Sequence, residues 1–493
     1  MYKLYKMDAI ADGYAIDDLL KVSVSKEDQT TRVESVIQDP DSFTTITGSS
    51  ATVRFTLPEK GQILAPNGRL IFKAIWSAFN AANDKMLSPP RFGGALSMIR
   101  EARLFCGALI ERNTLAGHKI NIQNNALPYD SQNEVIDVLL GSNHGYTYAA
   151  DGTIQLTDDI PNGSAGSRAL TNNENATVEY SVPLDSLFSC LKDVMIPTFL
   201  KNPIVIEIDF DLTLANNSND VVIISGAAGG AITGNVLVKR PRLDLDYLVL
   251  NEEMVNAFRS RVMMGAGLAY NFRNNHLIQK VLPAAVNSQN QENDLEIGLA
   301  STRVMKLFVE KQLSYDNTLL KGMRSDGLLG ETLQVFINNQ NLFDRNVDRL
   351  SDMYVYLGQA VGTSYKILNG AYELVGDKAA NNIMNNETKL PSAAAGNGTY
   401  NTVKENLQGR QRWLGVNLGQ SRAEGNDNPM NSLMIGESPI VLRLNRTIPA
   451  AGVASPRGEV NTNSAKASCN VNVFAEVVKV MMIQNGEIMV ANA

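Results

Sequence analysis

Three histidines are the residues of this 493-residue chain best suited to acid–base or metal chemistry. An imidazole can act as a general base or bind a metal ion near neutral pH. His118, His144 and His276 have no second histidine or cysteine at the spacing of metal ligands, and the last two each follow an asparagine. The pattern favours histidines at the surface or at helix caps, with a metal site or a general base as the alternative.

Three carboxylates, Glu207, Asp209 and Asp211, alternate with apolar residues along one segment. On an extended strand, residues two apart lie on the same face and about 7 Å apart. Such a row of like charges suits solvent or the basic face of a partner. A calcium site is the alternative, since calcium prefers oxygen ligands.

No catalytic motif is present in the sequence. Residues 226–231 are rich in glycine, but no Lys-Ser or Lys-Thr follows, so we expect a flexible loop and not a phosphate cradle. Neither a Gly-x-Ser-x-Gly elbow nor a His-Glu-x-x-His motif occurs. We therefore predict that the chain is not an enzyme and has no catalytic residues, no cofactor and no metal.

Alternation of polar and apolar residues predicts that most of the chain forms strands. In residues 204–214 every second residue is apolar, which indicates one buried and one wet face. Residues 51–57 and 178–182 follow the same pattern, and a last strand is expected near 471–483. Helical spacing is sparse and is confined to residues 184–194, 252–264 and 341–353.

Several of these segments occur twice, in the same order and about 231 to 236 residues apart. The clearest pair is Asn-Pro-Ile-Val-Ile at 202–206 and Ser-Pro-Ile-Val-Leu at 438–442. The other pairs are 69–76 with 303–310, 102–113 with 333–346, and 236–245 with 471–480. Long loops rich in Asn and Gly, 142–175 and 358–400, fall at matching places. Chance similarity within a β-rich chain is the alternative, but the shared order and spacing favour two copies of one unit.

Composition limits the classes of function. The net charge is −7, from 44 Lys and Arg against 51 Asp and Glu, so tight direct binding of nucleic acid is not expected. Three widely spaced cysteines do not form a disulfide framework and suit a reducing compartment, the cytoplasm or the nucleus of a host. The first residues lack the apolar core of a secretion signal, so we expect no secretion. No apolar run is long enough for a membrane span.

Two blocks of the sequence resemble a known family. Residues 92–111, with Phe-Gly-Gly-Ala-Leu followed by a strand and a bent hairpin, are one block. Residues 195–208, a short element feeding a strand that starts at Pro203, are the other. Together with the duplication, they are similar to blocks of the double jelly-roll major capsid proteins of double-stranded DNA viruses, in the virophage, polinton-like and adenovirus-like lineages.

The resemblance implies an all-β fold of two tandem eight-stranded jelly rolls, with few short helices and long loops. We expect an N-terminal arm at residues 1–48, a first roll at 49–250, and a second at 251–493 that starts with a helical junction near 252–264. The arm would lie under the shell, or be a frayed terminus. Three copies would supply six rolls to a trimeric, pseudo-hexagonal capsomer of an icosahedral shell.

The implied partners are other copies in a homotrimer, neighbouring capsomers, and penton, minor or cement capsid proteins, all in the virion capsid. Apolar residues in the long loops are the candidates for contacts between subunits: Tyr146, Tyr148, Tyr365, Tyr372 and Leu374.

Two other functions remain open at this point. A β-sandwich enzyme that acts on carbohydrate would need an aromatic cleft with paired carboxylates, whereas the chain has only Trp76 and Trp413 as tryptophans. Another virion protein, at the surface or in a fibre, is the second alternative.

Overall fold

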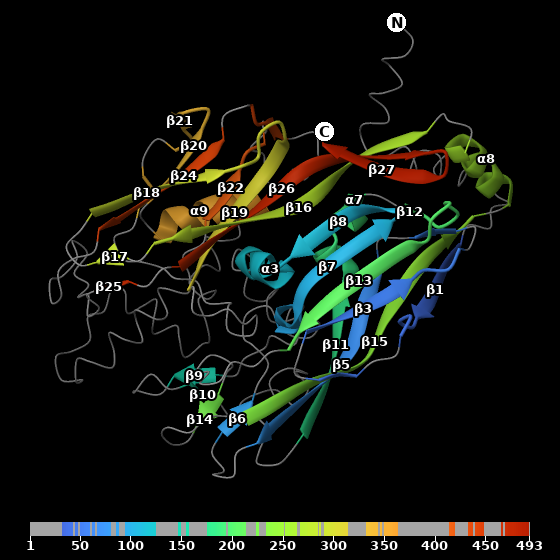
Figure 1. Cartoon of the computed structure of the whole chain (residues 1–493), viewed down its shortest axis with the longest axis horizontal. Helices are drawn as coiled ribbons and strands as arrows, with labels where there is room; N and C mark the ends of the chain where they lie inside the picture. Colours follow the sequence, from blue (N-terminus) through green and yellow to red (C-terminus); the bar gives the residue numbers. More distant parts are fainter. Residues whose placement is uncertain are drawn as a thin grey trace, which may run out of the picture.

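The molecule consists of two β-sandwiches that lie side by side (Figure 1). The computed structural model describes residues 32–42, 45–47, 50–59, 62–64, 67–79, 85–87, 94–124, 146–148, 154–156, 175–193, 196–212, 223–225, 233–250, 252–263, 267–283, 285–286, 290–313, 332–343, 346–347, 350–362, 414–419, 432–436, 439–447, 465–466 and 469–492.

The first roll packs two sheets face to face. We call them sheet A1, with seven strands, and sheet B1, with four. The central order of A1 is β11-β5-β15-β1, and the order of B1 is β3-β13-β7-β8. The strands of A1 are β1 (Arg32–Gln38), β2 (Ile46–Thr47), β4 (Gln62–Leu64), β5 (Arg69–Phe79), β11 (Asn175–Pro183), β12 (Ile196–Pro197) and β15 (Thr233–Val249). The strands of B1 are β3 (Ser50–Thr56), β7 (Ile99–Cys106), β8 (Ala108–Thr114) and β13 (Ile204–Asp211).

The second roll repeats this arrangement with sheet A2, of six strands, and sheet B2, of four. The central order of A2 is β22-β19-β26-β16, and the order of B2 is β18-β24-β20-β21. The strands of A2 are β16 (Leu268–Leu282), β19 (Arg303–Leu313), β22 (Leu414–Asn417), β23 (Leu433–Met434), β26 (Cys469–Gln484) and β27 (Glu487–Asn492). The strands of B2 are β18 (Asn290–Ile297), β20 (Thr332–Ile337), β21 (Gln340–Asn341) and β24 (Ile440–Thr447).

Strand for strand, the two orders match, and both follow the jelly-roll topology. Strands β16, β19, β24 and β26 begin 234 to 236 residues after β1, β5, β13 and β15. The segments that start at Pro203 and Pro439 become β13 and β24, which lie inside sheets B1 and B2. The prediction of a duplicated unit is therefore confirmed. The boundary at residue 49 remains a prediction, although β1 and β2 precede it and pair with β15.

The remaining elements are short. The helices are η1 (Gly94–Met98), α3 (Ala116–Asn124), α6 (Leu184–Leu187), α7 (Cys190–Asp193), α8 (Glu252–Met263) and α9 (Leu350–Val361). Three two-stranded pairs lie outside the rolls' sheets: β9 (Tyr146–Tyr148) with β10 (Ile154–Leu156), β6 (Lys85–Leu87) with β14 (Ile223–Ser225), and β17 (Ala285–Val286) with β25 (Ala465–Lys466). Helix α8 lies between β15 of the first roll and β16 of the second, and the predicted boundary at residue 251 remains a prediction. Helix α9 begins nine residues later than the predicted helix at 341–353.

Each roll has an apolar core between its sheets. In the first roll, the Phe72 ring of A1 lies 5.5 Å from the ring of Tyr180 and 5.2 Å from that of Phe210 in B1. All three side chains are buried, so this contact joins the two sheets. In the second roll, Val335 and Leu442 of B2 pack with Leu307 and Val473 of A2.

Strands β16 and β26 extend across both rolls, as Figure 1 shows for the red strand β26. Near one end, Phe272 and Met481 belong to the core of the first roll. Near the other end, Leu282 and Val473 belong to the core of the second. The two rolls therefore share two strands of one sheet, which fixes their relative position.

Helix α9 packs closely on β22 through a glycine. A Cβ atom placed on Gly415 would lie 2.8 Å from Cα of Leu357 and 3.0 Å from Cβ of Ala360. These distances are shorter than ordinary contacts, and one of them is to backbone. Only glycine lets the helix approach this strand so closely.

We predict that Gly415→Ala destabilises the protein by about 1–3 kcal/mol, as overpacking of a core contact does. Urea unfolding of the purified chain, followed by fluorescence, measures the effect. Gly298→Ala is the matched control, because a Cβ there meets no atom within 4 Å. Equal effects of the two substitutions would contradict the close packing of α9.

Candidate functional site: the seam between the rolls and the outer sheet faces

The structure describes only two of the five loop residues that were predicted to contact other subunits. Tyr146 and Tyr148 lie in β9, opposite Leu156 and Ile154 of β10. Tyr365, Tyr372 and Leu374 lie outside the described residues, as do most of the two long loops. The roles of these five residues in contacts between subunits remain predictions.

No metal centre is found among the described residues, since no three of their His, Cys, Asp or Glu side chains come together as metal ligands do. Within the same part of the chain, no helix is long and apolar enough to cross a membrane. Cys106 and Cys190 are buried thiols that form no disulfide, and burial raises the pKa of Cys106 to about 11.

The acidic row on β13 is neutralised within its own sheet. Arg103 of β7 lies directly opposite Glu207. Its guanidinium is 3.3 Å from the Glu207 carboxylate and 3.0 Å from that of Asp209. Asp209 also accepts a hydrogen bond from the Thr52 hydroxyl of β3. The row that could have suited calcium or a basic partner is thus largely satisfied by an arginine of the same sheet.

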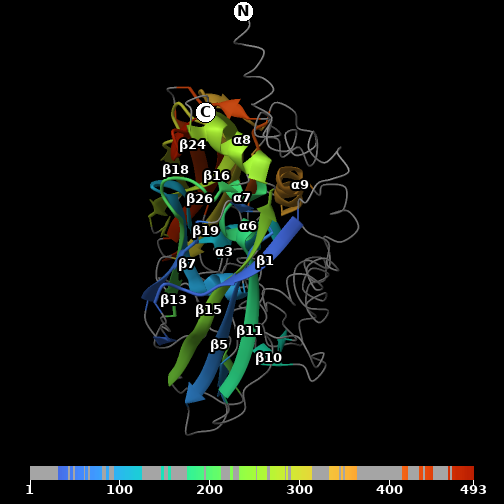
Figure 2. The same ribbon diagram turned by 90° about the vertical axis from the view of Figure 1, so that its right-hand side faces the viewer.

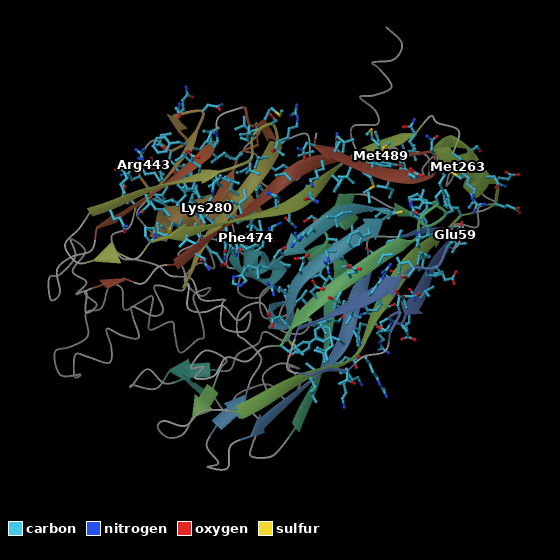
Figure 3. All side chains as sticks on the ribbon, viewed as in Figure 1. Glu59, Met263, Lys280, Arg443, Phe474 and Met489 are labelled. Carbon is cyan, nitrogen blue, oxygen red and sulfur yellow. The ribbon has the colours of Figure 1, made fainter. Side chains whose placement is uncertain are left out.

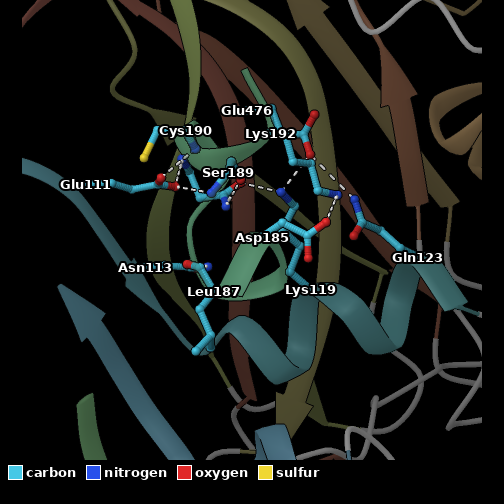
Figure 4. A network of polar contacts seen from close by, with 11 residues as sticks. Glu111, Asn113, Lys119, Gln123, Asp185, Leu187, Ser189, Cys190, Lys192 and Glu476 are labelled. Atoms are coloured by element: carbon cyan, nitrogen blue, oxygen red, sulfur yellow. Dashed lines mark hydrogen bonds and ion pairs between the residues drawn. The ribbon is translucent and has the colours of Figure 1, made fainter. Parts of the chain in front are cut away.

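The seam between the rolls holds a buried ion pair. Lys119 Nζ of α3, in the first roll, lies 2.6 Å from Glu476 Oε1 of β26, in the second (Figure 4). Burial would raise the pKa of Glu476, but the charges of Lys119 and Lys306 outweigh it and hold this pKa at about 2. Burial lowers the pKa of Lys119, and the Glu476 carboxylate opposes that shift. Glu476 is therefore ionised at neutral pH, and its carboxylate favours the charged form of Lys119.

Hydrogen bonds extend this pair into the first roll (Figure 4). The Lys119 ammonium also donates to the side-chain oxygen of Asn275 in β16. The amide of Asn275 donates to the Ser189 hydroxyl at 2.5 Å. Buried Glu111 accepts the backbone N–H groups of Ser189 at 3.0 Å and Cys190 at 2.8 Å, and burial raises its pKa.

His118 makes a second polar contact across the seam. Its Nδ1 lies 2.5 Å from Glu310 Oε1 of β19, and both side chains are buried. The same carboxylate oxygen accepts a hydrogen bond from Asn472 at 3.0 Å. The prediction of a surface or capping role is therefore wrong for His118, whereas His276 is exposed as expected. His144 lies outside the described residues.

Lys119, Glu310 and Glu476 were not among the residues that the sequence indicated as functional. Their partners are far apart along the chain, so spacing could not reveal them. One signal was present: Glu476 is the only acid in β26, whose apolar residues run almost without interruption. Such a run indicates a strand buried on both faces, where a charge needs a partner.

Comparison with solved structures identifies the fold. No protein-family model matches the chain, and no curated protein matches its sequence. The structure is similar to PBCV-1 VP54 as fitted into a reconstruction of the virophage Sputnik, with a TM-score of 0.54, 11% identity, and 95% of this chain and 98% of that chain covered.

Two further structures are similar over nearly their whole length. The major capsid protein of mavirus gives a TM-score of 0.51 at 12% identity and covers 93% of this chain and 90% of that one. A structure of the Sputnik virophage gives 0.51 at 11% identity, with 95% and 91% covered. The chain thus has the double jelly-roll fold of these viral capsid proteins, as the sequence blocks indicated.

The pKa of Glu476 leads to a prediction on acid stability. Its folded value of about 2 lies below its ordinary value of 4.5. The ion pair therefore stabilises the fold fully above about pH 4.5, and this contribution is lost as the pH falls toward 2. We expect Glu476→Gln to destabilise the protein by roughly 3–5 kcal/mol at pH 7, because Lys119 stays buried without its partner.

Urea unfolding between pH 7 and pH 3 measures this effect, and the difference between wild type and variant should shrink at the acid end. Replacing both Lys119 and Glu476 by Met should restore much of the stability. Glu487→Gln is the control, because the Glu487–Lys201 pair is exposed and such pairs contribute little. A Glu476→Gln effect as small as the control's would contradict the role of the seam pair.

Proposed function

We propose that this protein is the major capsid protein of an icosahedral double-stranded DNA virus. The observation that carries the proposal is the likeness to viral capsid proteins over more than nine-tenths of this chain, including both rolls and their order. Those neighbours are structural proteins, which supports a role in assembly and not in catalysis. We place the protein in the virion capsid, after synthesis in a reducing compartment of the host.

The capsomer that we propose is a homotrimer whose six rolls fill one pseudo-hexagonal position. Sheets A1 and A2 are equivalent, but their outer faces are buried to different extents, and this difference supports the homotrimer. The outer face of A2 is covered by α3 of the first roll together with α9 of the second, and Phe308 and Phe474 on it are 0% and 2% exposed. Ile122 of α3 packs against these two rings.

The outer face of A1 carries exposed apolar residues at its edge strand. Val33 and Ile37 of β1 are 62% and 60% exposed. They pair with Leu248 and Asp244 of β15 on the same face, while Val36 points to the core of the first roll. Figure 2 looks onto β1, β15, β5 and β11. An uncovered apolar edge of this kind marks a surface for a partner.

Because A1 and A2 are equivalent, we infer that the second roll of another copy covers A1, as the first roll covers A2 within the chain. Three such contacts close a ring. Each should bury on the order of 2,000 Å² or more, as obligate interfaces do. Neighbouring capsomers, and penton, minor or cement proteins, are the further partners of this proposal.

We predict that the purified protein is a trimer, with a mass three times the 53.7 kDa of the chain, and that Ile37→Lys converts it to monomers. Asp244 lies opposite Ile37, but its carboxylate is already bonded to Arg69 at 2.8 Å, so a lysine buried in the interface loses its hydration without gaining a free partner. Light scattering coupled to size exclusion measures the mass, and circular dichroism confirms the fold. Val281→Lys is the control, since Val281 is as exposed, at 65%, on the equivalent strand β16. A trimer that survives Ile37→Lys would exclude β1 from the interface.

We also predict weak contact with DNA, since the chain is acidic overall. Fluorescence anisotropy with a labelled duplex at physiological salt should give a Kd no tighter than about 1 µM, and added salt should weaken it further. A nanomolar Kd for the trimer would contradict this expectation.

A further inference from the structure

A groove of about 410 Å³ opens where the two rolls meet. Strand β8 of the first roll forms one wall with Leu109, Ile110, Arg112 and Thr114. Sheet A2 supplies the remaining residues, which are Asn274, Asn275, His276, Leu277, Gln279 and Lys479. The volume is within the range of about 300–1,000 Å³ that is typical of ligand sites.

The groove lies where one apolar core ends and the next begins. Along β16, Phe272 belongs to the first core and Leu282 to the second. Along β26, Met481 belongs to the first core and Val477 to the second. Polar residues occupy the intervening positions, among them His276 and Lys479. The strands that join the rolls thus carry a polar stretch under the groove.

Lys479 carries a charge for which the groove offers no counter-ion. Its side chain is partly buried, and among the described residues no carboxylate lies within ion-pair distance of it. Burial lowers the pKa of Lys479, and only the more distant charge of Glu111 opposes that shift. A partly dehydrated ammonium without a partner is unfavourable, and an anion beside it would relieve the cost.

A second cation lies in the same groove. Arg112 is 60% exposed, and one of its nitrogens lies 2.7 Å from Glu101 Oε2, which leaves other N–H groups available. His276 also lines the groove, but partial burial and the nearby charge of Lys479 lower its pKa and favour its neutral form. No lining residue is an Asp or a Glu, so the groove combines cations with amide and hydroxyl donors.

We propose that the groove is a binding site for a phosphate-type oxyanion, held by Lys479 from the second roll and Arg112 from the first. Arginine and lysine are the usual ligands of phosphate oxygens, arginine through its fork of N–H groups. Because the two cations come from different rolls, the bound anion links the rolls across the seam. The site requires only one folded chain, so it does not depend on the capsid role or on trimer formation.

Titration calorimetry with pyrophosphate, on the full chain at low ionic strength, tests the proposal. We expect one site per chain and a higher unfolding temperature with pyrophosphate, because a ligand of the folded state stabilises it. Lys479→Met keeps the apolar stem of the side chain and should weaken binding at least tenfold. Lys479→Arg should retain it, and Arg112→Gln should weaken it.

Lys280→Met is the matched control and should bind pyrophosphate as wild type does. Lys280 lies on β16 but outside the groove lining (Figure 3). Inorganic phosphate and a nucleoside triphosphate, titrated in parallel, distinguish a free anion from the phosphates of a nucleotide. Equal affinity in Lys479→Met and wild type would overturn the site, and so would the absence of binding. Tighter binding of an oligoglutamate peptide than of pyrophosphate would overturn the ligand class.

Discussion

The Lys119–Glu476 pair joins an element of the first roll to a strand of the second, and the position of each roll depends on this contact being complete. Removing either charge leaves the other buried without its counter-ion in the pair, which costs several kcal/mol. The pair lies on the outer face of sheet A2, whereas the strands of that sheet contribute to both apolar cores through their inner face. One sheet thus fixes the rolls through packing on one face and through charge on the other.

The sequence predicted the strands whose alternation is regular and whose copies are similar. Residues 204–208 and 440–444 show this best, because both become the central strand of a sheet with one buried face. Strand β1 was placed in an arm because Glu34, Ser35 and Gln38 make its sequence look polar. Val33 and Ile37 lie on its exposed face, whereas Glu34 and Gln38 lie on the face toward the core, so polar and apolar residues do not separate as in an ordinary half-buried strand. The seam could not be predicted, because its ion pair joins residues that only the completed fold brings together.

Sheets B1 and B2 show how the two copies of the unit differ in their outer faces while the charges within each sheet remain balanced. In B1 the acids lie on the inner strand β13, and Arg103 of the neighbouring β7 balances them. In B2 the arginine, Arg443, lies on the inner strand β24, and Glu292 and Asp294 lie on the edge strand β18, at 2.8 and 2.7 Å. At equivalent positions of this strand, the first roll has Glu207 and the second has Arg443. The structure shows that the neighbouring strand carries the opposite charges, so each sheet is balanced while the pattern of its outer face differs.

Duplication also explains why one sheet face is buried and its equivalent is exposed. The two fused rolls form one contact with each other within the chain. The equivalent surfaces that this contact does not use are then available to other chains. The contact within the chain combines an apolar cluster with buried charges, and those charges would be unsatisfied against the wrong surface. The free face of A1 has no such charges at β1 and offers Val33 and Ile37 instead. A contact made through this apolar edge leaves no buried charge without a counter-ion. Such a contact suits association between chains after each has folded.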